Sequence, residues 1–187
     1  MTVICRNIFF AGLLLMGLSA CKTGIDKDTY GKFQNSGSEI TNQAQAVLLS
    51  NVGSAIQKGG TEFAVEFCHL KASPLIDSLS QVFSCNISRV SEKNRNPNNA
   101  LNKTERELWK VFQTRTLPDT LLRLNSKIIY YKRIHTAMPA CLKCHGNVDG
   151  EIDSATLEKI QKLYPNDLAT GYQLNDFRGL WKVVFEE

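Results

Sequence analysis

The pentapeptide Cys141-Leu142-Lys143-Cys144-His145 carries two thiols three positions apart and an imidazole directly after the second thiol. This C-x-x-C-H spacing is typical of c-type haem attachment, in which each thiol forms a thioether with one vinyl group of the same porphyrin. The histidine then becomes the proximal ligand of the iron. We therefore predict one covalently attached haem c, with Cys141 and Cys144 as attachment points and His145 on the iron.

Two other functions of a paired-cysteine motif are disfavoured by the surrounding sequence. A thioredoxin-like redox pair opens a helix within a βαβ pattern, and no such pattern surrounds Cys141 and Cys144. A structural zinc ion takes four protein ligands, generally with a second paired motif, and the sequence has none.

The N-terminus has the features of an exported lipoprotein. Residues 1–20 resemble a secretory signal peptide, because Arg6 supplies a positive charge and the apolar run 8–18 is short for a membrane span. The segment Leu18-Ser19-Ala20-Cys21 resembles a bacterial lipobox, so Cys21 is expected to carry the lipid anchor. An ordinary signal peptide or an uncleaved anchor are the alternatives. We expect a protein anchored in the bacterial cell envelope and facing the periplasm, where c-type haem is attached.

The rest of the chain divides into a linker and one domain. Residues 21–38 are polar and contain Gly and Ser, so they are predicted to be a flexible tether. Residues 39–187 suit a single haem-binding domain of ordinary size. The net charge of +4 is not gathered into a basic stripe with aromatic residues, which disfavours a nucleic-acid partner.

The second axial ligand of the iron must come from upstream of the motif, because no Met, His or Cys follows His145. This disfavours a common His/Met cytochrome. The candidates are Cys68, His69, Cys85, His135 and Met138. Helical periodicity places Cys68 on an apolar face, which suits a buried core thiol as well as a ligand. Cys68 and Cys85 could equally form a disulfide in an oxidising compartment.

Hydrophobic periodicity and turn residues indicate an α+β domain around a small antiparallel sheet. The expected helices cover residues 39–58, 61–79, 103–114 and 154–163, and the expected strands cover residues 86–90, 127–134 and 180–185. Gly59-Gly60 separates the first two helices.

A series of motifs lies in order between about Ala55 and Val184: Cys68 with Ala72, Arg89 with Ser91, Arg95-Asn96-Pro97 with Asn99, the haem motif, Tyr164-Pro165 with Asp167 and Ala169-Thr170-Gly171-Tyr172, and Asp176 with Arg178-Gly179. Together they resemble a family of exported single-haem c-type proteins with a PAS-like fold, long known only as a domain of unknown function. The haem motif is specific by itself, and the others are specific through their joint order.

The resemblance implies a PAS-like antiparallel sheet with N-terminal helices and a distal iron ligand at Cys68. It also implies that Arg89, Arg95 and Arg178 pair with the haem propionates, since guanidinium groups bind carboxylates bidentately. Tyr172 is implied to lie at the haem edge. A thiolate ligand donates electron density to iron, so a low reduction potential is expected.

These features favour a lipid-anchored, low-potential electron carrier that serves a redox partner protein of unknown identity. With both axial positions filled, no iron site is open to a substrate, so an enzyme is disfavoured. The alternatives are a haem-based redox or gas sensor, in which a ligand displaces Cys68, a small peroxidase-type enzyme, or a structural lipoprotein stabilised by its haem.

Overall fold

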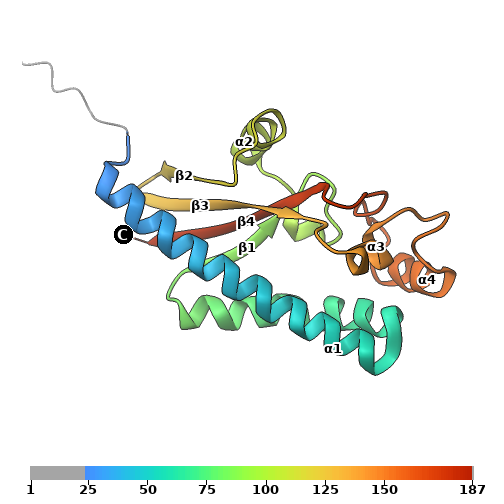
Figure 1. The fold of residues 1–187 in the computed structure, drawn as a ribbon. Helices are drawn as coiled ribbons and strands as arrows, with labels where there is room; N and C mark the ends of the chain where they lie inside the picture. The colour runs from blue at the N-terminus through green and yellow to red at the C-terminus, as the bar shows by residue number, and fades with distance from the viewer. Residues whose placement is uncertain (1–23, 187) are drawn as a thin grey trace, which may run out of the picture.

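The computed structural model describes residues 24–186, so the predicted signal peptide and Cys21 lie outside the described part of the chain. The fold is α+β, as predicted, and contains one four-stranded antiparallel sheet with the order β1-β4-β3-β2 (Figure 1). The strands are β1 (Asn86–Val90), β2 (Asp119–Leu124), β3 (Lys127–His135) and β4 (Phe177–Glu186). The helices are α1 (Lys27–Val82), α2 (Lys103–Thr114), α3 (Pro139–His145) and α4 (Ser154–Leu163), with a 3-10 turn at Pro97–Asn99.

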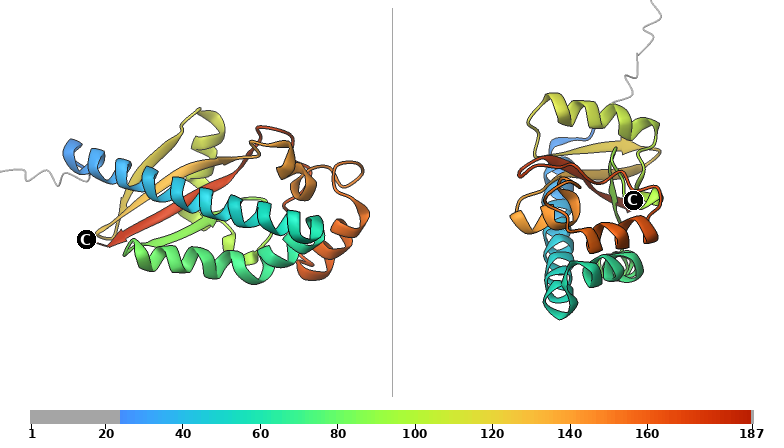
Figure 2. Two further views of the ribbon diagram at one scale, coloured as in Figure 1. Left: turned by 60° about the horizontal axis from the view of Figure 1, so that its bottom comes forward. Right: turned by 90° about the vertical axis from the view of Figure 1, so that its right-hand side faces the viewer.

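Helix α1 consists of two arms that run back along each other (Figure 2). The reversal lies at Gly59-Gly60, where Gly60 has a φ of 73°, a conformation that costs glycine little. The first arm covers residues 27–58 and the second covers residues 61–82. The predicted helix break is therefore confirmed, although both arms extend beyond the predicted ends. No helix within residues 24–186 is long and apolar enough to cross a membrane.

The start of the first arm corrects the predicted flexible tether. Asp26 caps the helix by accepting a hydrogen bond from the Thr29 backbone N–H at 3.0 Å. Tyr30 and Phe33 then pack against the core between α1 and the sheet. Residues 27–38 are thus helical and docked, because apolar contacts from every third or fourth residue outweigh the polar, Gly-containing composition.

At Gly37 the first arm of α1 lies directly against Tyr130 of the sheet, so we expect its substitution to lower stability. A Cβ atom at Gly37 would lie 2.3 Å from Cγ of the fully buried Tyr130. We expect Gly37→Ala to lower the free energy of unfolding by about 1–3 kcal/mol in urea denaturation followed by circular dichroism. Gly31→Ala is the control on the same arm, where a Cβ would meet no atom within 4 Å, and should stabilise by about 0.4–1 kcal/mol. Equal destabilisation by both variants would contradict the close docking.

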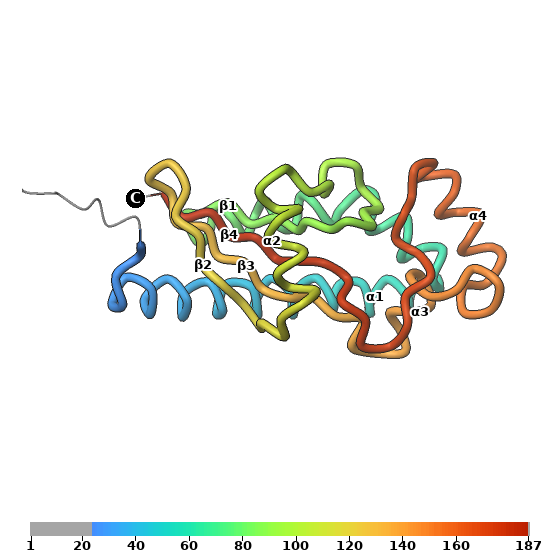
Figure 3. The backbone as a smooth tube through the Cα atoms, turned by 90° about the horizontal axis from the view of Figure 1, so that it is seen from above, coloured from blue at the N-terminus to red at the C-terminus, as the bar shows by residue number. Residues whose placement is uncertain are grey.

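The two faces of the sheet have separate cores, since successive side chains of a strand point to opposite faces. Tyr130 belongs to the core under α1, and Tyr131 belongs to the core under α2. Helices α1 and α2 cover opposite faces of the sheet, whereas α3 and α4 lie beyond one end of it (Figures 1 and 3). A third cluster, centred on Val65, Ile152 and Ile160, joins the second arm of α1 to α4.

Candidate functional site

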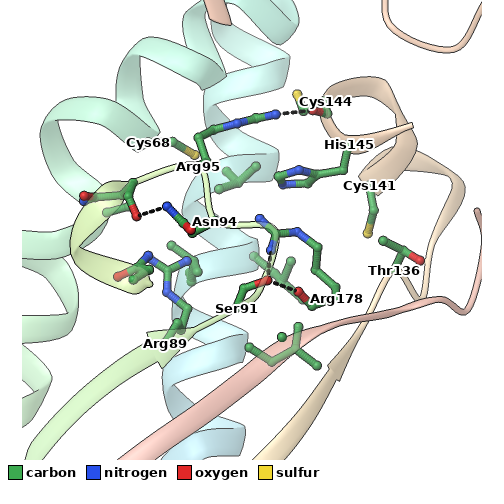
Figure 4. Close-up of a pocket in the computed structure, with 18 of the residues that line it drawn as sticks. Cys68, Arg89, Ser91, Asn94, Arg95, Thr136, Cys141, Cys144, His145 and Arg178 are labelled. Atoms are coloured by element: carbon green, nitrogen blue, oxygen red, sulfur yellow. Dashed lines mark hydrogen bonds between the residues drawn. The ribbon is translucent and has the colours of Figure 1, made fainter. Parts of the chain in front are cut away.

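A cavity of about 260 Å³ lies at this end of the sheet, between both arms of α1, the ends of β1 and β3, and α3 (Figure 4). Its apolar wall comes mainly from the first arm, with Leu48, Val52 and Ile56. All predicted cofactor-binding residues except Tyr172 line this one cavity: Cys68, Arg89, Arg95, Cys141, Cys144, His145 and Arg178. Residues as distant in sequence as Cys68 and Arg178, which are 110 positions apart, therefore meet in a single site.

Helix α3 presents the haem motif to the cavity. Pro139 at its first turn fixes the backbone for helix initiation, and Cys141 and Cys144, three positions apart, share one face of the helix. Both thiols line the cavity, and in Figure 4 they lie on either side of the His145 ring. The arrangement suits a flat ligand held at two points beside the imidazole.

The His145 ring is prepared to bind a metal through Nε2. Its Nδ1–H donates to the carbonyl oxygen of Ala169 at 2.8 Å, and because a carbonyl only accepts, this bond fixes the tautomer. Burial, followed by the nearby Arg178 and Arg95 cations, lowers the pKa of His145 well below its ordinary value. The ring is therefore neutral near pH 7, and Nε2 keeps a lone pair. A histidine whose other nitrogen donates to a carbonyl is the usual pattern for a metal ligand.

The second thiol of the motif is held in the protonated form. Burial raises the pKa of Cys144 to about 11, although Arg95 acts in the opposite direction. Every strand pair within residues 24–186 is antiparallel, so the βαβ unit in which a thioredoxin-like pair lies is absent from this part of the chain.

Cys68 and His135 are the two distal-ligand candidates that line the cavity. Cys68 projects from the second arm of α1, on the wall across from His145 (Figure 4). The small, buried Ala64 and Ala72 lie one turn before and after it, as the helical periodicity predicted. His135 ends β3, the strand that leads into α3, and its Nδ1 lies 3.0 Å from the carbonyl oxygen of Asn175.

The other candidates lie elsewhere. The exposed His69 contacts the ring of Tyr164 edge-on at 5.1 Å, and Met138 is 42% exposed. Cys85 packs against the core under α1. Cys68 and Cys85 are both free thiols, so the disulfide alternative is wrong.

The charges around Cys68 favour its deprotonation upon metal binding. Burial raises the pKa of the Cys68 thiol, whereas the Arg89 and Arg95 cations act to lower it. The same cations attract a thiolate once a metal displaces the proton. Cys68 is therefore a half-buried thiol that lines the cavity in a cationic environment, which an ordinary core cysteine does not need.

Two of the predicted arginines retain hydrogen-bonding capacity. Within residues 24–186, no hydrogen-bond acceptor binds the Arg89 guanidinium, which lies over the Trp181 ring at 5.6 Å. Arg178 donates through Nη1 to Ser91 Oγ at 3.3 Å, but its buried Nε has no partner in the same part of the chain. A buried donor without a partner is rare, so Arg178 suits an anionic ligand such as a carboxylate, and the partly exposed Arg89 brings a second guanidinium to the same cavity.

Arg95 and Tyr172 both have partners within the protein. Arg95 forms a two-point ion pair with Asp167, through Nε at 3.1 Å and Nη2 at 3.0 Å, while its side chain lines the cavity, so its pairing with a propionate stays a prediction. Tyr172 does not line the cavity. It is buried against the His145 ring, edge-on, with the ring centroids 6.4 Å apart. Tyr172 therefore supports the histidine, and its place at the haem edge stays a prediction.

Ala169 is the functional residue that sequence reasoning did not assign. Its contribution is a backbone carbonyl, which any residue type provides, so no side-chain signal could identify it. Asp167 was part of a recognised motif, but its partner Arg95 lies 72 positions away, and only the fold brings the two together.

A family model and a solved structure match the chain. The chain matches the family model described as Tll0287-like over residues 28–185. Among solved structures, it is similar to the crystal structure of the cyanobacterial haem protein Tll0287, with a TM-score of 0.65 and 20% sequence identity. That alignment covers 83% of this chain and 96% of the other, and it shows a shared fold. No curated protein sequence matches the chain.

Proposed function

Because this chain belongs to the Tll0287-like family, we propose that it binds one haem, attached covalently through Cys141 and Cys144, and that it transfers electrons. The observation that carries the proposal is the His145 ring, which donates Nδ1–H to Ala169 and lies between the two thiols of one cavity. A haem bound there would supply a one-electron couple between ferric and ferrous iron. The sheet and its helical cover would then form a PAS-like haem domain.

The proposed ligand pair is His145 and Cys68. Cys68 is on the opposite wall, is a free thiol and faces two cations. A thiolate stabilises the ferric state and lowers the reduction potential. Arg89 and Arg178 would bind the propionates through their unused donors. With protein ligands on both sides of the iron, outer-sphere electron transfer is favoured over substrate turnover.

The packing of the second arm favours a carrier over a ligand-exchange sensor. The Thr61 hydroxyl bonds Asp153 Oδ2 at 3.1 Å and lies 2.5 Å from the Thr156 hydroxyl, which ties the start of this arm to α4. Val65, one turn before Cys68, packs in the cluster that also contacts Cys144. Displacing Cys68 from the iron would strain contacts that hold the attachment helix itself.

The proposal includes a location and a partner. The signal-like N-terminus supports a lipid anchor at Cys21 and a position in the bacterial cell envelope, facing the periplasm. An electron carrier requires a donor and an acceptor, so the partner class is a redox protein of the same compartment. A radiolabelled fatty acid that enters wild-type protein but not Cys21→Ala tests the anchor.

Low-temperature electron paramagnetic resonance of the ferric, haem-loaded protein tests the ligand pair. We expect a low-spin signal with the narrow g spread of thiolate ligation, because Cys68 and His145 occupy opposite walls. A low-spin signal of the bis-histidine type would move the distal ligand to His135. A high-spin signal would contradict a closed iron and bring the sensing or enzymatic functions forward.

A further inference from the structure

Arg95 connects three parts of the site that are distant in sequence. Besides the two bonds to Asp167, its Nη2 donates to the carbonyl oxygen of Cys144 at 2.6 Å and to that of Ala169 at 3.4 Å. Its side chain and that of Asp167 are 11% and 8% exposed, so water competes little for these bonds. Arg95 therefore joins the end of α3 to the backbone turn at residues 167–169.

The same turn holds the proximal histidine. Asp167 Oδ1 accepts the backbone N–H of Ala169 at 2.9 Å, and the Ala169 carbonyl accepts the Nδ1–H of His145 at 2.8 Å. Arg95 donates to this same carbonyl. The residue that orients the His145 ring, Ala169, is thus held through its N–H by Asp167 and through its carbonyl oxygen by Arg95.

We propose that the Arg95–Asp167 pair positions His145 and sets the reduction potential of the iron that His145 ligates. This inference rests on the proposed function, because it concerns the bound haem. Both residues are positioning residues: Arg95 acts through the Ala169 carbonyl, Asp167 acts through the Ala169 N–H and through Arg95, and both act through their charges.

The charge effect has a defined sign. A positive charge near the iron favours the reduced state, and a negative charge favours the oxidised state. In the wild type the two charges lie 3.0 Å apart and largely cancel. Removing either charge leaves the other uncompensated in a poorly hydrated place, so the two single changes act in opposite directions.

The test compares Arg95→Gln, Asp167→Asn and the double variant by spectroelectrochemical titration of the haem-loaded protein. Asp167→Asn should raise the reduced-to-oxidised ratio at fixed potential about tenfold, equivalent to ~59 mV for one electron, and Arg95→Gln should lower it similarly. The double variant, neutral again, should return toward the wild-type potential. In Arg95→Gln, broader low-spin resonance lines should report a less uniform His145 ring orientation.

Glu105→Gln is the matched control, because Glu105 is 2% exposed and forms a buried ion pair with Lys182 at 2.7 Å on the α2 side of the sheet. It should lower stability without moving the potential. Shifts of the same sign in both single variants, or none, would overturn the charge effect, and low-spin lines as narrow as in the wild type in Arg95→Gln would overturn the positioning role. Covalent haem is measured in each unfolded variant as the pyridine complex, so wild-type protein without it would overturn the proposed function as well.

Discussion

Replacing Cys141 and Cys144 together by serine is expected to abolish covalent haem attachment. Both thiols line the same cavity and flank His145, and a serine hydroxyl forms no thioether. After expression with an export and haem-attachment system, haem staining of a denaturing gel should fall from a strong band to background. This is the largest effect expected from any substitution in the chain, since it removes the cofactor from the protein.

Cys85→Ser is the control for this experiment, because it removes a thiol that packs in the core under α1 and lies outside the cavity. It should keep the haem band. The single variants Cys141→Ser and Cys144→Ser should each retain one thioether and a weaker band. A double variant that still carries haem through unfolding would show that the attachment points lie elsewhere.

Where local signals and packing agree, the sequence predicts elements with correct ends. Helix α2 covers Lys103–Thr114 as predicted, because Asn102 and Glu105 form a reciprocal capping box before an amphipathic run. The predicted bounds of α4 are likewise confirmed. Strand β2 was missed, because its Leu-rich run is not β-branched. The signal that could have found it is the Asn125-Ser126 turn, where both residues have positive φ, as a two-residue hairpin requires.

For the site too, features set by local spacing are predicted from the sequence, whereas features set by contacts between distant segments are not. The spacing of Cys141, Cys144 and His145 is local, so the sequence alone predicts that they share a wall. The exclusion of Cys85 and the commitment of Arg95 to Asp167 depend on contacts between distant segments. Residue type identifies Arg95 as a possible carboxylate partner, but the nearest carboxylate in the fold belongs to the protein itself.

Replacing Cys68 by serine is expected to change the ferric spectrum and raise the reduction potential. Cys68 lies across the cavity from His145, and the Arg89 and Arg95 cations favour its thiolate. A serine oxygen donates less electron density to iron, so the ferrous state becomes relatively more stable. We expect a rise of more than about 60 mV, a more than tenfold change in the redox ratio, in spectroelectrochemical titration.

The nearly isosteric Cys85→Ser again serves as the matched control, since a change common to both variants would arise from stability and not from ligation. An unchanged spectrum in Cys68→Ser would contradict ligation by this thiol. His135 would then be the ligand to test, because it is the other candidate that lines the cavity. A His135→Ala variant with an altered spectrum would place the distal ligand on the strand leading into α3. The second arm of α1 would then only form a wall of the cavity. Arg89 would bind a haem carboxylate but would have no ligand thiolate to stabilise.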